Sequence, residues 1–228
     1  MVHPIKLEKL FYTIPYGDTI LEDINLEVGA GEFIGILGHN GTGKTTLLDL
    51  IMGFKKPVNG RISVIGEDPH SIDRVRKHKV VFLSQDVAIK GNLSIKDFLK
   101  FHSSFYDDYS VEVEGHLVNV FGLSYDMKIG ALSTGQQKKV QVIAAFATKP
   151  EVIIIDEITA VLDPETRDIF FRELENVRVQ YNSAILLATN IAEDLTTRAH
   201  KVFFIEDRKG VLHDPKDIHH LFNIGKAA

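Results

Sequence analysis

The chain of 228 residues contains no cysteine, and this absence excludes disulfides and thiolate metal sites. No apolar run approaches the length of about 18–20 residues that a membrane-spanning helix needs. The N-terminal residues 1–6 lack the charged and apolar regions of a signal peptide. We therefore expect a cytoplasmic protein without direct membrane insertion, in which any role at a membrane depends on a partner chain.

An excess of positive charge is also missing. The formal net charge of −5 gives no reason to expect nonspecific nucleic-acid binding. The short basic run over residues 74–79 is typical of a solvated helical face. Ten histidines are present, but the spacing of His213, His219 and His220 fits no compact metal site. With 44% hydrophobic and 25% charged residues, the composition is typical of a globular protein of one domain, with room for a sizeable insertion.

The most informative segment is Gly38–Thr45, which matches the pattern G-x-x-x-x-G-K-[ST]. An apolar strand candidate, Glu32–Leu37, precedes it, and Thr46–Met52 follows with apolar residues at helical spacing, with Gly53 as the stop signal of this helix. Glycines let backbone N–H groups turn towards an anion, and the helix N-terminus adds partial positive charge. Lys44 would reach the β- and γ-phosphates, and Thr45 would place its hydroxyl on Mg²⁺. The predicted phosphate contacts of this nucleoside triphosphate site are Gly38, His39, Asn40, Gly41, Thr42, Gly43, Lys44, Thr45 and Thr46.

A second motif joins a hydrophobic run to two carboxylates. Val152–Ile155 consists of β-branched residues only, which predicts a strand buried on both faces of a parallel sheet. Asp156 and Glu157 follow at the carboxyl end, the edge at which α/β proteins bind ligands. We expect Asp156 to hold Mg²⁺ and Glu157 to polarise the water that attacks the γ-phosphate.

A third segment, Leu132–Lys139, comes directly before a helical pattern. Ser133 and Gly135 lie at the start of this helix, where N–H groups without intrahelical partners attract anions.

The remaining pattern predicts an α/β fold with an all-helical insertion, because no convincing strand occurs from about residue 87 to 149. The predicted strands are Ile5–Ile14, Thr19–Val28, Gly60–Ile65, Val80–Leu83, Val152–Ile155, Ala184–Ala188 and Val202–Ile205, in addition to the strand before the glycine loop. Helical periodicity covers residues 92–106, 111–121 and 164–180.

Taken together, these motifs resemble the nucleotide-binding subunit of ATP-binding-cassette (ABC) transporters over nearly the whole chain. The matching segments are Walker A at Gly38–Thr45, the Q-loop at Gln85, the L-S-G-G-Q signature at Leu132–Gln136 with Thr134 for the first glycine, Walker B at Val152–Glu157 and the D-loop at Ala160–Asp163. The resemblance implies a RecA-like P-loop core with an N-terminal antiparallel β subdomain and an inserted all-helical subdomain. Residues 1–86 and 150–228 would form the core, and residues 87–149 the insertion, within a single ABC ATPase domain.

The resemblance also implies cofactors and partners. ATP and Mg²⁺ would bind between two cassettes that close head to tail, the second cassette being identical or different. Ser133, Gly135 and Gln136 of one chain would cap the γ-phosphate bound by the other. Gln85 would touch Mg²⁺ and the attacking water, and would contact an integral membrane permease. The chain would then work peripherally at the inner face of the cell membrane.

Three further positions, besides Thr134, depart from the family pattern. Asn190, after the strand Ala184–Ala188, stands where the family usually has a histidine. An amide can donate a hydrogen bond but cannot become cationic, and neutral hydrogen bonds are about half as strong as charge-assisted ones. Ile158 replaces a proline and Val161 a common glycine. We therefore predict slow ATP hydrolysis, while the presence of Glu157 argues against an inactive site.

Several alternatives stay open at this point. Tyr16 is the candidate for stacking on adenine, with Tyr12 as the alternative. The chain ends soon after Val202–Ile205, and this favours an exporter ATPase by family analogy. Other possible functions are a soluble ABC ATPase in cofactor assembly or DNA repair, and a catalytically weak regulatory half of a heterodimer. The helical insertion lacks the sustained heptads of a repair-type coiled coil.

Overall fold

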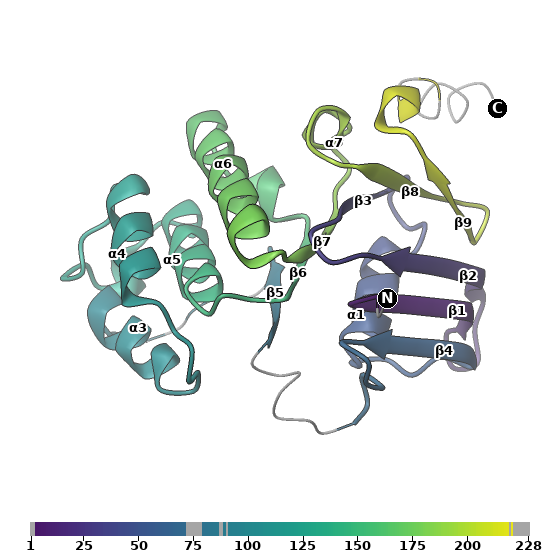
Figure 1. Cartoon of the computed structure of the whole chain (residues 1–228), viewed down its shortest axis with the longest axis horizontal. Coiled ribbons are helices and arrows are strands. Elements are labelled where there is room, and N and C mark those ends of the chain that lie inside the picture. Colours follow the sequence, from purple (N-terminus) through teal and green to yellow (C-terminus); the bar gives the residue numbers. More distant parts are fainter. Residues whose placement is uncertain (1–2, 72–78, 87–88, 90, 219, 221–228) are drawn as a thin grey trace. The chain divides into compact units, whose positions relative to one another are not determined.

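The computed structural model describes residues 3–71, 79–86, 89, 91–218 and 220. The chain divides into two compact units, the first within residues 1–76 and 184–228 and the second within residues 77–183 (Figure 1). Most of the predicted basic helical stretch, residues 72–78, and His219 lie outside the described residues.

The first unit contains a three-stranded antiparallel sheet of order β2-β1-β4 (Figure 1). Its strands are β1 (Ile5–Thr13), β2 (Thr19–Val28) and β4 (Asn59–Val64). In β1, the side chains of Ile5, Leu7 and Tyr12 are buried while exposed residues lie between them, because one face of the sheet covers the core. All three strands were predicted, each to within one residue of its observed ends.

A second sheet in this unit carries the glycine-rich loop. Its strands are β7 (Ala184–Ala188), β3 (Phe33–Leu37), β8 (Lys201–Glu206) and β9 (Lys209–His213), in that spatial order. The central strand β3 runs parallel to β7 and β8, and it is buried along its whole length. Helix α1 (Lys44–Ile51) follows the loop, and Gly53 with φ of 77° ends it as predicted, because glycine adopts the left-handed conformation without a steric penalty. The short helix α7 (Glu193–Thr196) and a 3₁₀ turn at Pro215–Asp217 complete the unit.

The antiparallel strand β9 is an element that the sequence analysis did not predict. Asp207 and Arg208 connect it to β8, with positive φ angles of 47° and 71°. Such a turn usually contains glycine or asparagine, which would have signalled a hairpin. Val211 and Leu212 in β9 are exposed, so the strand also lacks the alternation typical of a half-buried strand.

In its described residues, the second unit combines two parallel strands with four α-helices that are described in full. The strands are β5 (Val80–Ser84) and β6 (Val152–Asp156), and the helices are α3 (Ile95–Ser103), α4 (Val111–Val120), α5 (Thr134–Phe146) and α6 (Pro164–Tyr181). The described residues between 87 and 149 contain no strand, and only an isolated bridge joins Ser94 to Lys128. This agrees with the predicted helical insertion. The limits of that insertion, residues 87–149, remain a prediction.

Two features hold the helices of this unit. The rings of Phe146 on α5 and Phe170 on α6 stack with their centroids 6.1 Å apart. The buried carboxylate of Glu114 on α4 accepts hydrogen bonds from the hydroxyls of Tyr109 at 2.7 Å and Tyr125 at 2.9 Å. Burial and the hydrogen bond to this carboxylate raise the pKa of Tyr125 to about 12. Both hydroxyls therefore stay protonated and donate at neutral pH.

Helix α3 is shorter than the predicted span of residues 92–106. The hydroxyl of Ser94 accepts a hydrogen bond from the backbone N–H of Asp97, so the helix begins at Ile95. Among the residues that the structure describes, no helix combines the length and hydropathy that crossing a bilayer requires.

Candidate functional site

The loop between β3 and α1 encloses the side chain of Lys44. This lysine is 5% exposed, and its ammonium donates hydrogen bonds to the carbonyl oxygens of Gly38 at 2.9 Å and His39 at 3.2 Å. The hydroxyl of Thr42 donates to the same His39 oxygen at 2.9 Å. The loop therefore holds the charged end of the lysine side chain against backbone carbonyl groups.

Two glycines of this loop are required by space and by backbone conformation. A Cβ atom added to Gly38 would lie 2.6 Å from the carbonyl oxygen of Ile205. Gly43 has φ of 101°, and a Cβ atom there would lie 2.8 Å from Ile20. Because Gly43 precedes α1 and has no side chain, it cannot cap the first N–H groups of the helix. The loop and the helix N-terminus thus fit phosphate oxygens, which accept hydrogen bonds and carry negative charge.

Asn190 belongs to the same sheet edge as this loop. Strands β3 and β7 are parallel, with Ile36 opposite Ala188, and the backbone N–H of Thr189 donates to the Ile36 oxygen at 3.2 Å. Parallel strands end at a common edge, so Asn190 and Gly38 both follow the carboxyl ends of neighbouring strands. The side chain of Asn190 is exposed.

In the second unit, the structure brings together Gln85 and the two carboxylates at the carboxyl end of β6. Ser84 lies opposite Asp156 in the parallel pair β5–β6, and the backbone N–H of Gln85 donates to the backbone carbonyl oxygen of Asp156 at 3.2 Å. The Gln85 side-chain nitrogen donates to a carboxylate oxygen of Glu157 at 3.4 Å. Asp156 is 5% exposed. The adjacent strand ends therefore place an amide beside an acidic pair.

Glu157 has a backbone conformation that is unusual for its residue type. Its φ angle is 50°, in the left-handed region, and a 3₁₀ turn, Ile158–Val161, follows it directly. This conformation costs about 1–2 kcal/mol for a residue with a Cβ atom. Ile158 is fully buried, so the turn forms here without the proline that the family pattern has. Val161 is 38% exposed.

The signature-like segment forms the N-terminus of α5. The Ser133 hydroxyl accepts a hydrogen bond from the Gln136 N–H at 3.3 Å, and the Gln136 side chain accepts one from the Ser133 N–H at 3.0 Å. This reciprocal pair is a capping box, which fixes the first turn of the helix. A hydroxyl can accept and donate at the same time, so capping is compatible with donation to a phosphate oxygen. Ser133 is exposed and Gly135 is half-buried.

The two tyrosines considered for adenine stacking differ in exposure. Tyr12 is 8% exposed and packs in the core, whereas Tyr16 is fully exposed in the turn after β1. Only an exposed ring offers a face to a base. The exposure favours Tyr16, which remains a prediction.

Histidines do not gather into a metal site in the part of the chain that the structure describes, where no three His, Cys, Asp or Glu residues could hold an ion together. The sequence analysis missed one buried charge beside Gln85, that of Lys138, which is 2% exposed. Lys139 follows it directly, and no pattern in the sequence distinguishes the two lysines.

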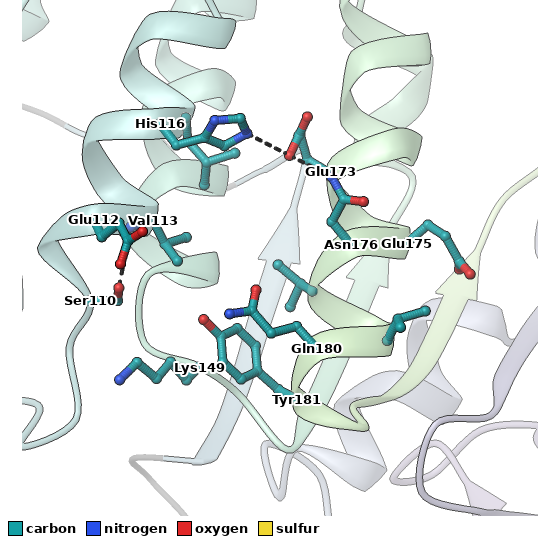
Figure 2. A pocket seen from close by; sticks show the side chains of 13 residues that line it. Ser110, Glu112, Val113, His116, Lys149, Glu173, Glu175, Asn176, Gln180 and Tyr181 are labelled. Carbon is teal, nitrogen blue, oxygen red and sulfur yellow. Dashed lines mark hydrogen bonds and ion pairs between the residues drawn. The ribbon is translucent and has the colours of Figure 1, made fainter.

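A cavity of about 680 Å³ lies between α4 and α6, and none of the residues that line it is a predicted site residue (Figure 2). Figure 2 shows His116 of α4 and Glu173 of α6 pointing towards each other. The Nε2 atom of His116 and the Oε2 atom of Glu173 are 3.0 Å apart. Burial raises the pKa of Glu173, but hydrogen bonds from Asn176, His116 and Arg172 outweigh it and hold the pKa below its ordinary value. The bond from His116 joins α4 to α6, and the bonds from Arg172 and Asn176 lie within α6. These contacts within one unit indicate a structural role.

A strand, a glycine-rich loop with an enclosed lysine and a helix define a P-loop nucleotide-binding protein. The family model described as "ABC transporter" matches residues 21–160. The chain belongs to the ABC transporter family, as the resemblance of its motifs predicted.

Similar proteins agree with this assignment. The chain is 32% identical to the energy-coupling factor transporter ATP-binding protein EcfA2 of Clostridium tetani, over 91% of this chain and 77% of that protein. It is 32% identical to the spermidine/putrescine import ATP-binding protein PotA of Spiroplasma citri, over 84% of this chain and 56% of that protein.

Solved structures show the same fold. An ATP-binding subunit of an ABC transporter matches with a TM-score of 0.84 at 22% identity, over 98% of this chain and 95% of that one. The cbiO1 protein of Clostridium perfringens, part of the ABC transporter complex cbiONQ, matches with a TM-score of 0.79 at 24% identity, over 99% and 94%. The predicted fold class, a P-loop α/β core with an antiparallel β part and a helical insertion, is confirmed.

Proposed function

We propose that the chain hydrolyses ATP and, as one of two cassettes that close on ATP, drives a separate integral membrane permease. The observation that carries this proposal is the carboxylate of Glu157, which follows a buried strand and accepts a hydrogen bond from Gln85. A regulatory nucleotide site needs a phosphate cradle but no such base. A carboxylate oriented by an amide is suited to polarise an attacking water.

Nucleotide binding is assigned to the glycine-rich loop and the start of α1. Lys44, now bound to carbonyl oxygens of its own loop, would turn to the β- and γ-phosphates, because charge-assisted hydrogen bonds to phosphate are stronger than those to neutral carbonyls. The exposed ring of Tyr16 would stack on adenine. The other contacts proposed are Gly38, His39, Asn40, Gly41, Thr42, Gly43, Thr45 and Thr46.

The proposed Mg²⁺ ligands are Thr45, Gln85 and Asp156. This set offers a hydroxyl, an amide oxygen and a carboxylate, the oxygen ligands that Mg²⁺ prefers. The Gln85 nitrogen donates to Glu157, so the amide oxygen is the atom left to serve as a ligand. The ion would neutralise charge on the phosphates. The residues present therefore fit the cofactor by their chemistry.

A second cassette would complete the site. Ser133 and the backbone of Gly135, at the N-terminus of α5, suit a γ-phosphate bound by that cassette, and Gln136 holds Ser133 in place. Relatives named as transporter ATP-binding proteins support a permease partner and a location at the inner face of the membrane. The export direction expected from the chain end gains no support, because relatives include proteins named for import.

Asn190 supports slow hydrolysis. It follows β7 at the edge that also holds the glycine-rich loop, so a donor there would face phosphates bound by that loop. A neutral amide stabilises the charge that develops in the transition state less than a cationic imidazole does. The same residue favours a second candidate function, in which the chain is the catalytically weak half of a heterodimer.

Steady-state phosphate release at saturating Mg·ATP tests the proposal. The wild-type chain is expected to release phosphate, Glu157→Gln to bind ATP without releasing it, and Lys44→Ala to do neither. Equal rates for wild type and Glu157→Gln would contradict the assignment of the base. A silent wild type that becomes active only with a second, different cassette would support the heterodimer.

A further inference from the structure

Lys138 is a buried lysine in the second turn of α5. Its ammonium donates a hydrogen bond to the carbonyl oxygen of Ser84 at 2.9 Å and to the side-chain oxygen of Gln141 at 3.3 Å. The neighbouring Lys139 is only half-buried, and its ammonium lies 3.4 Å from the carbonyl oxygen of Phe121. The two lysines thus have the same chemistry but hold different parts of the second unit.

Burial of Lys138 is costly. Burial lowers the pKa of its ammonium, and the negative charge of Asp86 offsets this only in part. An apolar side chain of similar length would fill the same space without losing hydration. Packing alone therefore does not explain a lysine at this position, whereas a specific need for its donors does.

The acceptor on Ser84 belongs to a peptide group that serves the proposed site. The carbonyl of Ser84 and the N–H of Gln85 lie in one rigid peptide plane and point in opposite directions. Lys138 donates to the carbonyl, and the N–H donates to the Asp156 oxygen at 3.2 Å. Hydrogen bonds thus fix this peptide group on both sides, and the side chain of Gln85 extends from it towards Glu157.

The other end of the link is the capped start of α5. Lys138 stands two residues after Gln136, which forms the capping box with Ser133. The two hydrogen bonds of the capping box make the first turn of α5 rigid, so a movement of Ser133 would be transmitted to the backbone of Lys138.

We propose that Lys138 is a positioning residue that ties the N-terminus of α5 to the Ser84–Gln85 peptide. Engagement of Ser133 by a γ-phosphate would then set the orientation of Gln85 and of its partner Glu157. The inference rests on the proposed hydrolysis and adds to it a route by which phosphate contact at one residue orients the base at another.

The test compares Lys138→Met, which keeps the length and removes the donor, with Lys139→Met as the matched control. Lys138→Met is expected to lower kcat by about 10- to 100-fold, because small misplacements of catalytic groups cost this much. The KM for ATP should change by less than about twofold, since the phosphate cradle is untouched. Lys139→Met should leave both constants as in the wild type.

Hydrogen exchange of the Gln85 amide, followed by mass spectrometry, gives a readout that does not depend on turnover. Lys138→Met should speed exchange over residues 84–86 and leave the rest of β5 and α6 as in the wild type. If Lys138→Met does not fold, Lys138→Gln takes its place in the experiment, because a glutamine side chain is too short to reach the carbonyl oxygen of Ser84. Unchanged exchange over residues 84–86, or a uniform increase that Lys139→Met shares, would overturn the proposal. A wild type without turnover would refute the proposed function, and the exchange comparison would still decide on Lys138.

Discussion

The side-chain nitrogen of Gln85 lies 3.4 Å from a carboxylate oxygen of Glu157, although the two residues are 72 positions apart in the sequence. Parallel pairing of β5 and β6, with Ser84 opposite Asp156, brings their ends together. The amide of Gln85 orients the carboxylate by donating a hydrogen bond to it, and the amide does not take up a proton itself. This arrangement is the one that the proposed base needs, because the carboxylate stays available to water while it keeps a defined orientation.

Lys44→Ala should weaken the binding of Mg·ATP. The ammonium group is the only full positive charge in the segment Gly38–Thr45, and its loss removes charge-assisted hydrogen bonds to two phosphates. We expect at least about a 30-fold rise in Kd, equivalent to about 2 kcal/mol. Isothermal titration calorimetry measures the Kd, and Lys55→Ala is the control, because Lys55 is a half-buried lysine that lies outside the loop and pairs with Asp49. Equal affinities for wild type and Lys44→Ala would show that phosphates bind elsewhere.

Asn190→His should accelerate hydrolysis. An imidazole that carries charge would stabilise the transition state by about 1–2 kcal/mol more than an amide, or roughly tenfold in rate. Phosphate release at saturating Mg·ATP measures the change, and Glu157→Gln sets the background. A wild-type rate that already equals that of Asn190→His would show that the amide serves equally well. If Asn190→His stays at the background, the weakness lies at Ile158, at Val161 or in a missing partner chain.

Ser133 has two roles that substitution can separate. Ser133→Ala removes the cap of α5 and should lower the free energy of unfolding by about 1 kcal/mol. Ser133→Asp keeps a good cap, so its stability should match the wild type, but its charge should repel a γ-phosphate and prevent closure of the dimer. Thermal unfolding and ATP-dependent chromatography in the Glu157→Gln background measure the two effects. An ATP-dependent dimer that tolerates Ser133→Asp would refute contact between Ser133 and phosphate.

Glu173→Gln should destabilise the protein most at neutral pH. The folded-state pKa of Glu173 is below the ordinary value of 4.5, so its contribution is complete above that pH and is lost as the pH falls through the folded pKa. We expect a loss of about 1–3 kcal/mol at pH 7, because buried hydrogen bonds to a charged group are lost. Urea denaturation at pH 7 and at pH 4 measures the difference between variant and wild type, which should shrink at the lower pH.

The control for this prediction is Glu175→Gln. Glu175 has a side chain that is 52% exposed and pairs with Arg178 on the same helix. Its loss should cost less than about 1 kcal/mol at either pH. A destabilisation by Glu173→Gln that is the same at pH 7 and pH 4 would contradict the lowered pKa.

The sequence predicted those parts of the fold that depend on local pattern. The β-branched run before Asp156 and the alternation in β1 marked their strands, and Gly53 marked the end of α1. The strand β9 was missed because Asp207 and Arg208 adopt positive φ angles without the glycine that usually signals such a turn.

Tertiary position explains what the sequence could not predict in the candidate site. Lys138 and Lys139 are chemically equal, and only the packing of α5 against the end of β5 buries the first of them. Tyr16 was the candidate for adenine stacking and Tyr12 the alternative, and their different exposure became evident only in the folded sheet. The left-handed conformation of Glu157 has no signal in its residue type either.

The molecular mass of the Glu157→Gln variant in solution, with and without ATP, tests the central claim most directly. Glutamine keeps the size of the side chain and the nearby partner Gln85, but it cannot act as a base, so bound ATP should persist and hold two cassettes together. Size-exclusion chromatography with light scattering is expected to show a dimer with saturating Mg·ATP and a monomer without nucleotide. The double variant Lys44→Ala, Glu157→Gln should stay monomeric under both conditions. A monomeric Glu157→Gln chain that still binds ATP would contradict a dimer of identical cassettes.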